Sequence, residues 1–138
     1  MLIEDYALIG DSYTAALVGR NGSIDWLCVP RFDSDACFAA LLGTPAHGRF
    51  RIAPRDEAGR VTRRYRGDSL VLETETRSAG GVVRVVDFMP LRVGRPVVVR
   101  VVEGVAGRVP MRFELAVRFD YGEVTPWVRS SLVRVTAP

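Results

Sequence analysis

Residues 14–30, TAALVGRNGSIDWLCVP, contain two apolar runs separated by Arg20-Asn21-Gly22-Ser23. The pair Asn-Gly is a strong signal for a β-hairpin, because both central positions of a type I′ turn need a positive φ. The stretch therefore predicts two antiparallel strands, near residues 14–19 and 23–29, with a tight turn between them. Pro30 ends the second strand, since proline cannot donate to a strand ladder.

Strand periodicity continues from residue 48 onward. In MRFELAVRFD (111–120), every second residue is apolar, which predicts one buried face on that strand; its members are Met111, Phe113, Leu115, Val117 and Phe119. Residues 69–90 predict two strands joined across 78–81, and residues 95–117 predict a third hairpin around 104–107. Shorter strands are expected in GRFRIAP (48–54), VTRRYRG (61–67) and SSLVRVTAP (130–138).

The run from Val97 to Val102 is apolar on both faces except for Arg100. A strand of that composition is normally covered on both sides. We therefore expect it either to be central in its sheet or to be covered by a partner.

One short α-helix is predicted near residues 34–42, in SDACFAALLG. Ser34 or Asp33 can cap its start, and Gly43 can supply the left-handed residue after its end. The helical spacing of Phe38, Leu41 and Leu42 directs them to the core. Eight or nine strands joined by short loops, with this one helix, predict an all-β antiparallel sandwich or barrel that forms a single domain over residues 1–138.

Composition disfavours several classes of partner and cofactor. All 19 basic residues are arginine, and the net charge is +3, but they are spread among 16 carboxylates with no long basic block, so we expect no nucleic-acid binding. No apolar run approaches the roughly 20 residues that span a bilayer, and the acidic start MLIEDYALIGD is unlike a signal peptide, so a cytoplasmic protein without membrane contact is predicted. Cys28 and Cys37 are expected to be buried free thiols, because with His47 they cannot complete a four-ligand zinc site. No metal and no cofactor are expected.

No residue of this chain is predicted to be catalytic. Glu73 and Glu75 lie two apart in a strand, so their side chains are roughly 6 to 7 Å apart, close to the carboxylate spacing of an inverting glycosidase. Nothing adjacent in sequence would raise the pKa of either one, and two glutamates on a solvated strand face are common. His47, the single histidine, lies in a loop without a nucleophile-elbow pattern.

Aromatic residues and one loop are candidates for ligand contact. Trp26, Trp127, Tyr13 and Tyr121 could stack on sugar rings, although aromatic residues in strands more often fill the core. The direction of the Trp26 side chain cannot be assigned from alternation alone. Residues 31–34 form a loop of the kind that presents polar groups to a ligand or a neighbouring domain; the simpler alternative is that Asp33 caps the helix while Arg31 pairs with a carboxylate.

Several segments together resemble the start of glycoside hydrolase family 15 proteins of the bacterial and archaeal trehalase-like and glucoamylase-like type. The segments are IEDYALIGDSYTAALVGRNGSIDWLCVPRFDSDACFAALLG, LETETRSAGGVVRVVDFMP, RVVEGVAGRVPMRFELAVRFDYG and TPWV, in that order. The resemblance implies an N-terminal β-sandwich of the supersandwich type that precedes a catalytic (α/α)₆ barrel, which this chain lacks. It implies inverting hydrolysis of an α-glucosidic bond for the parent protein, and a truncated sandwich with an exposed sheet edge or face for this chain.

Three functions follow as expectations. The first is a non-catalytic domain that supports the barrel of the same polypeptide and borders its substrate site through Trp26, Arg31, Phe32 and Asp33. The second is a stand-alone carbohydrate-binding module for α-glucans or trehalose. The third is an interaction protein that forms homo-oligomers through its sheet edges.

Overall fold

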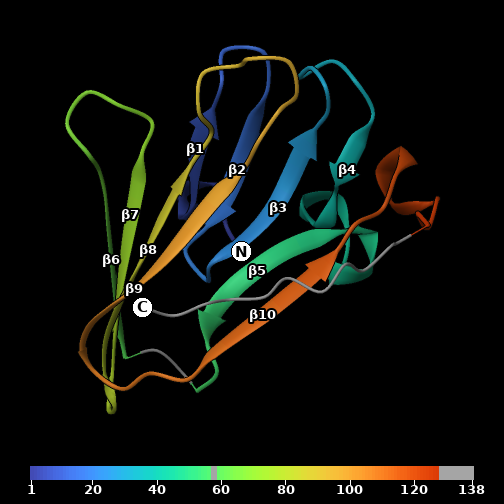
Figure 1. Ribbon diagram of the computed structural model, residues 1–138. Coiled ribbons are helices and arrows are strands. Elements are labelled where there is room, and N and C mark those ends of the chain that lie inside the picture. The colour runs from blue at the N-terminus through green and yellow to red at the C-terminus, as the bar shows by residue number, and fades with distance from the viewer. Residues whose placement is uncertain (57–58, 128–138) are drawn as a thin grey trace.

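The computed structural model describes residues 1–56 and 59–127, in which two antiparallel β-sheets pack face to face (Figure 1). The first sheet has the strand order β1-β2-β3-β5-β10, with β4 paired to β3; its strands are β1 (Tyr6–Gly10), β2 (Ala15–Gly19), β3 (Ser23–Cys28), β4 (Ala36–Phe38), β5 (Arg49–Pro54) and β10 (Met111–Ala116). The second sheet has the order β6-β7-β8-β9; its strands are β6 (Arg60–Tyr65), β7 (Leu72–Ser78), β8 (Gly81–Phe88) and β9 (Val99–Gly107). The predicted all-β sandwich is confirmed. The strand predicted in residues 130–138 lies outside the described residues.

Helical structure in the described ranges is limited to four short 3₁₀ turns. They are η1 (Ile3–Asp5), η2 (Ala40–Leu42), η3 (Pro45–His47) and η4 (Asp120–Gly122). No helix in this part of the chain is long and apolar enough to cross a bilayer. Both cysteines are free and buried, as predicted.

The β2–β3 hairpin forms where Asn21-Gly22 predicts it. The amide of Gly22 donates to the carbonyl of Gly19 (2.9 Å), and the Asn21 side chain accepts from the amide of Ser23 (3.1 Å). Only Gly22 has a positive φ (78°), so the turn is not the type I′ form that needs two such residues. A Cβ on Gly22 would clash with the carbonyl oxygen of Ile52, so the close approach of β5 also requires glycine.

The prediction of an α-helix near residues 34–42 is wrong. Residues 36–38 instead form β4, where Phe38 pairs with Leu27 and Ala36 with Cys28, and all three residues of β4 are buried. A segment of nine residues gains little from helix propensity, so pairing with the open edge of β3 decides its conformation. Two details of the prediction also change: Leu42 is exposed, and Gly43 has extended backbone with a φ of −162°.

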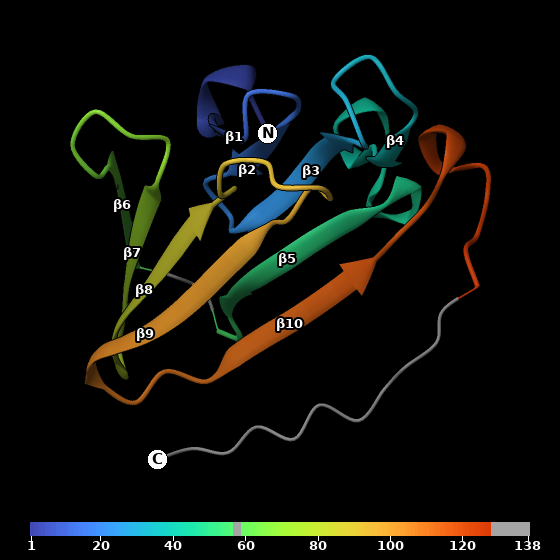
Figure 2. The same cartoon turned by 45° about the horizontal axis from the view of Figure 1, so that its top comes forward.

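The third predicted hairpin, around residues 104–107, is also wrong. β9 continues through residue 107 and pairs with β8, whereas β10 pairs with β5 in the other sheet. The chain therefore crosses between the sheets over residues 108–110 (Figures 1 and 2). The hairpin predicted across residues 78–81 is confirmed as β7–β8.

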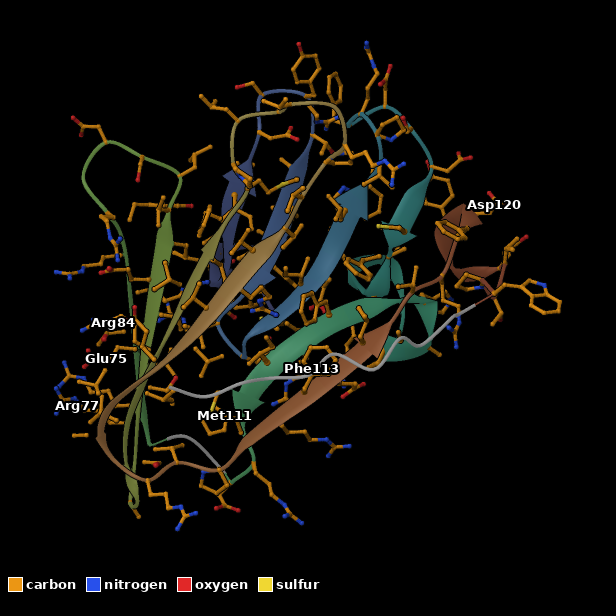
Figure 3. The ribbon with its side chains drawn as sticks, viewed as in Figure 1. Glu75, Arg77, Arg84, Met111, Phe113 and Asp120 are labelled. Carbon is orange, nitrogen blue, oxygen red and sulfur yellow. The ribbon has the colours of Figure 1, made fainter. Side chains whose placement is uncertain are left out.

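Two strands near one corner of the sandwich are less buried than their apolar sequences suggest; for residues 97–102 this leaves cover by a partner as the remaining prediction. β9 is the edge strand of the second sheet and is largely exposed, so it is not central. Phe113 is 63% and Leu115 50% exposed, although alternation predicts them in the core (Figure 3). The reason is the unequal size of the sheets. β9 lies over the β2–β3 turn and β5, as hydrogen bonds from Arg100 to the carbonyls of Gly22 (2.9 Å) and Phe50 (2.8 Å) show, and β10 extends beyond this cover.

The main apolar core lies between the two sheets. It consists of Ile9, Ala16, Val18, Ile24, Leu27, Cys37, Phe38, Leu72 and Met89. Outside this cluster, a buried ion pair joins Arg100 to Asp87 (2.7 Å), with both side chains only 1% exposed. Arg100 also donates to the carbonyls of Gly22, in the β2–β3 turn, and Phe50, in β5. The ion pair therefore connects the two sheets.

Candidate functional site

Three loops that are distant in sequence meet at one end of the sandwich, at the top of Figure 1; we call this surface the loop end. The loops are residues 11–14 between β1 and β2, residues 29–35 between β3 and β4, and residues 89–98 between β8 and β9. Loops on a rigid sheet scaffold are where binding residues concentrate. The loop end is therefore the candidate functional site.

Arg92 connects the three loops. Its Nε donates to a carboxylate oxygen of Asp11 (2.7 Å), and its Nη2 donates to the carbonyl of Pro30 (2.6 Å). Its guanidinium carbon lies 5.1 Å from the centre of the Tyr13 ring, a cation–π arrangement. The amide of Phe32 in turn donates to the carbonyl of Tyr13 (3.0 Å), so the loops are bound to each other as well as to Arg92.

Asp11 is the buried anchor of this arrangement. Its second carboxylate oxygen accepts from the amides of Tyr13 (3.0 Å) and Thr14 (2.9 Å), which closes the turn between β1 and β2. Burial alone would raise the pKa of Asp11, but the hydrogen bonds from Arg92, Thr14 and Tyr13 outweigh it and hold this pKa below its usual range. Ser12 adopts a backbone conformation with a positive φ (74°) inside this turn.

The surface that these loops present is apolar. Tyr13 is 55%, Phe32 71%, Leu91 82% and Val93 92% exposed. Exposed large apolar side chains that gather on ordered loops mark contact sites for another molecule or domain. The loop end thus combines a fixed backbone with an apolar contact surface.

The predicted site residues divide into two places. Arg31, Phe32 and Asp33 lie on the loop end. Arg31 pairs with Asp33 (2.9 Å), and both side chains are more than half exposed. This pair lowers the pKa of Asp33 and raises that of Arg31. Asp33 caps no helix, because β4 replaces the predicted one, while the Ser34 hydroxyl accepts from the amide of Arg31 (3.2 Å) and closes the turn.

Trp26 lies elsewhere, on the outer face of the first sheet. Its ring packs against that of Tyr121, with 6.2 Å between the ring centres, and against the small cluster of Cys28, Ala36 and Ala39. The direction of Trp26 follows from a β-bulge: Leu17 pairs with Trp26 but Val18 pairs with Ile24, so one extra residue, Asp25, is inserted in β3. The structure therefore separates the contacts of Trp26 from those of the Arg31 loop.

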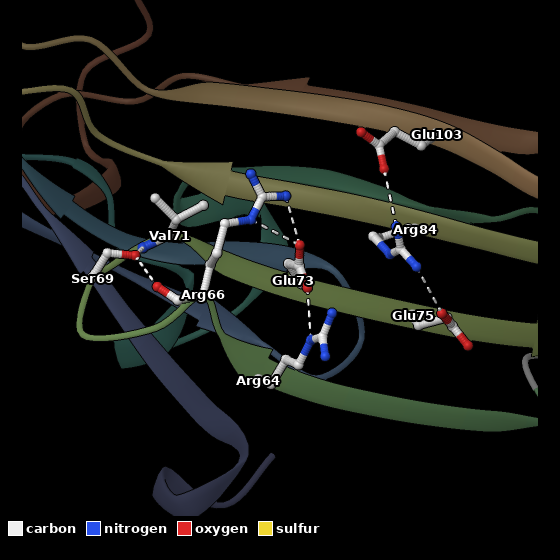
Figure 4. A network of polar contacts seen from close by, with 8 residues as sticks. All are labelled: Arg64, Arg66, Ser69, Val71, Glu73, Glu75, Arg84 and Glu103. Atoms are coloured by element: carbon white, nitrogen blue, oxygen red, sulfur yellow. Dashed lines mark hydrogen bonds and ion pairs between the residues drawn. The ribbon is translucent and has the colours of Figure 1, made fainter.

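The two strand glutamates form ion pairs on the outer face of the second sheet (Figure 4). Glu73 accepts from Arg66 (2.6 Å) and Arg64 (2.7 Å), and these hydrogen bonds lower its pKa. Glu75 accepts from Arg84 (3.3 Å), which also reaches Glu103. A general acid needs a raised pKa at neutral pH, so Glu73 is poorly suited to that role.

Metal ligands do not gather at this end of the sandwich or elsewhere in the described ranges. Among residues 1–56 and 59–127, no group of three or more His, Cys, Asp or Glu side chains could hold a metal ion. His47 lies on η3, where its ring nitrogen is within hydrogen-bond distance of Thr44.

A family model described as "Trehalase-like, N-terminal" matches residues 1–135. The chain belongs to this family. It is 38% identical to Trehalase 1 of Sulfolobus acidocaldarius over 92% of this chain and 21% of that protein. It is 35% identical to a trehalase of Thermoplasma volcanium over 90% of this chain and 21% of that protein.

A trehalase of Mycolicibacterium smegmatis is 40% identical over 63% of this chain and 13% of that protein. The chain thus spans about a fifth of the length of the relatives that it matches along most of its own length. No solved structure matches it significantly. The comparisons agree with the resemblance to trehalase-like proteins drawn from the sequence motifs.

Sequence reasoning missed the central residues of the loop end in this trehalase-like domain. Asp11 ends the motif DYALIGD, and its place before Ser-Tyr-Thr is typical of an Asx turn, so its local role was detectable. Its pairing with Arg92 joins positions 81 residues apart. A local sequence pattern cannot predict a contact between residues so far apart in the sequence.

Proposed function

We propose that this chain is the non-catalytic N-terminal domain of a family 15 glycoside hydrolase that cleaves an α-glucosidic bond in trehalose or a related glucoside. Residues 1–138 act in this proposal as one β-sandwich domain. The relatives named trehalase support it, because they match this chain along most of its length and extend far beyond it. The lowered pKa of Glu73 supports a non-catalytic role for the most conspicuous carboxylate.

The loop end carries the more specific part of the proposal. We infer that it packs against the catalytic domain of the same polypeptide and contributes to one wall of the substrate site. The supporting observation is the exposed apolar set Tyr13, Phe32, Leu91 and Val93 on loops that the buried Arg92–Asp11 pair holds in place. Ordering three loops costs conformational entropy. A surface that binds another domain benefits from this order, because it then keeps the shape that its partner contacts.

The experiment uses the full-length parent enzyme with substitutions at the loop end. Phe32→Ala and Tyr13→Ala are expected to lower the thermal stability of the catalytic domain or to raise KM for trehalose. Arg31→Ala tests the border of the substrate site, where a rise in KM is expected. Arg77→Ala, on the outer face of the second sheet, is the matched control. The Arg77 side chain is about as exposed as that of Arg31, but it is remote from these loops. If all three loop-end variants keep the stability, turnover and KM of the unsubstituted enzyme, the proposed contact is wrong.

A carbohydrate-binding module for α-glucans or trehalose is the second candidate. Its support is the Trp26–Tyr121 pair, because half-buried aromatic rings on a sheet face can stack on pyranose rings. Titration of the 138-residue chain with trehalose and with maltooligosaccharides, followed by tryptophan fluorescence, separates the two candidates. Saturable binding that Trp26→Ala abolishes favours the module, and a constant signal favours the supporting domain.

We place the protein in the cytoplasm as part of this proposal. Cys28 and Cys37 are both free and buried, which fits a reducing compartment. Activity of the full-length enzyme in a cytosolic rather than a secreted fraction is the expected result.

A further inference from the structure

A second feature lies at the opposite end of the sandwich from the loop end. A cavity of about 380 Å³ opens between the two sheets, beside the β2–β3 turn and the end of β5. Small-molecule sites begin at roughly 300 Å³, so this volume suffices for a compact ligand. None of the described lining residues belongs to the main apolar core cluster, so the cavity lies beside that cluster.

The inner wall of the cavity is polar where a sandwich core is normally apolar. Thr74 and Thr76 line it from β7, although Leu72, on the same face of that strand, lies in the apolar core. Thr74 is 94% buried, and its hydroxyl has no hydrogen-bond partner within residues 1–56 and 59–127. A buried hydroxyl without a partner is costly, so it needs a water molecule or a ligand. Asp87 also lines the cavity, but Arg100 already satisfies its carboxylate.

The rim of the cavity is basic. Arg20 and Arg55 line it, and among the described lining residues the rim also carries the carboxylate of Asp56. Arg51 borders the cavity too, but its side chain leaves β5 on the face opposite Phe50, toward the outer side of the sheet. Arg20 pairs with Asp5 (3.5 Å), so its guanidinium group keeps donors for a further acceptor. Guanidinium groups match the geometry of carboxylate and phosphate oxygens.

The remaining walls are aliphatic. They comprise Ile52, Ala53, Pro54, Val61 and Val85, and none of the described lining residues is aromatic. A neutral glucoside would have no ring to stack on here, in contrast to the surface around Trp26. The walls instead suit the C–H groups of a small ligand whose hydroxyls face Thr74 and Thr76.

We propose that this cavity binds a small polyhydroxylated organic anion, with its anionic group at the rim arginines and a hydroxyl at Thr74. A sugar phosphate and a sugar acid share this chemistry. The proposal is independent of the function proposed for the loop end, because it uses different residues at the other end of the sandwich.

Isothermal titration of the 138-residue chain with four probes tests the proposal. Glucose 6-phosphate and gluconate represent the two anion types, and glucose and inorganic phosphate are the two halves of the first probe. We expect saturable binding of at least one of the two hydroxylated anions, with weaker binding of glucose and of inorganic phosphate. Which of the two binds more tightly identifies the anionic group.

Substitutions then locate the site. Thr74→Val, which keeps the side-chain shape, and Arg20→Gln are each expected to weaken binding about tenfold, the scale of one hydrogen bond to a charged or polar partner. Arg77→Gln on the outer face is the matched control and should leave the affinity unchanged. The proposal is overturned if no probe binds, because the cavity then holds only water. It is equally overturned if inorganic phosphate binds as tightly as glucose 6-phosphate and Thr74→Val has no effect.

Discussion

At the scale of single residues, the ion pair between Arg92 and Asp11 decides the shape of the loop end. The Asp11 carboxylate is fully buried, and its three hydrogen bonds come from two loops. A buried carboxylate is tolerated only when such contacts replace its hydration. Loss of either partner is therefore expected to affect the whole loop end.

Arg92→Gln is predicted to lower the free energy of unfolding by about 3 kcal/mol, because it leaves the Asp11 charge buried without its main partner. Urea denaturation followed by tryptophan fluorescence measures this change. Arg31→Gln is the matched control, since it also removes an arginine from an ion pair of the same end, but an exposed one. Equal stability of the Arg92 and Arg31 variants would contradict the prediction.

The lowered pKa of Asp11 predicts how the pair responds to pH. A carboxylate with a lowered folded-state pKa stabilises the protein above its unfolded value of about 3.9, and this contribution is lost as pH falls through the folded-state pKa. Asp11→Asn is therefore expected to destabilise the protein by a constant amount from pH 7 to about pH 5, and by a decreasing amount toward pH 3. Urea denaturation of both proteins across this range measures the difference. A difference that already falls between pH 7 and pH 5 would show that this pKa is raised.

At the scale of elements, local signals in the sequence predicted strands well and their partners poorly. The Asn-Gly turn and the Gly80-Gly81 turn identify two hairpins, because each is a contact between neighbours in sequence. β4 has the composition of a helix, and only the vacant edge of β3 makes it a strand. β9 and β10 are neighbours in sequence but belong to different sheets, which periodicity alone does not encode.

The candidate site shows the same division. Residues 31–33 are recognisable as a surface loop from Pro30 and the polar sequence that follows. Trp26 could not be oriented because the bulge at Asp25 interrupts the alternation on which such an assignment depends. The pairing of Asp11 with Arg92 can be recognised only once the three-dimensional fold is known.

The alternation in β10 correctly separates an apolar face from a polar one, although the apolar face is largely exposed. Glu114 on the opposite face pairs with Arg49 (2.8 Å), as expected for a solvated side. Phe113 touches Phe50 at the border of the core, with 5.3 Å between the ring centres. Uncovered apolar strands promote association.

Phe113→Ser is predicted to reduce self-association of the 138-residue chain while changing its stability by less than about 1 kcal/mol, because the side chain is mostly exposed. Light scattering over a range of protein concentrations measures association, and urea denaturation measures stability. Ile24→Ala, in the buried core, is the contrasting variant and should cost about 2 to 5 kcal/mol. A chain that is monomeric at all concentrations would show that this face does not mediate contact between copies.

At the scale of the whole molecule, the Arg100–Asp87 pair holds the two sheets together where the apolar core ends. Arg100 lies on β9 and donates to the carbonyls of Gly22, in the β2–β3 turn, and Phe50, in β5. Its removal therefore leaves one carboxylate and two carbonyls without their donor. Arg100→Met is predicted to destabilise the protein by about 3 to 5 kcal/mol. Urea denaturation measures this loss.

The double variant Asp87→Val with Arg100→Met distinguishes the pair from simple packing. Removing both charges avoids an isolated buried carboxylate, so the double variant is expected to be more stable than the sum of the two single effects implies. Strict additivity of the two single effects would contradict a direct coupling between these residues.

The pairing of β5 with β10 has a consequence for how the chain acquires its fold. These strands lie 57 to 67 positions apart, between the pairs Met111–Pro54 and Ala116–Arg49, and the entire second sheet is encoded between them. During synthesis β5 emerges long before its neighbour, so one edge of it stays open while four further strands are made. Hairpins form in microseconds, but such a distant ladder must await loop closure, which makes its assembly the slow step of folding and the period of greatest exposure to aggregation.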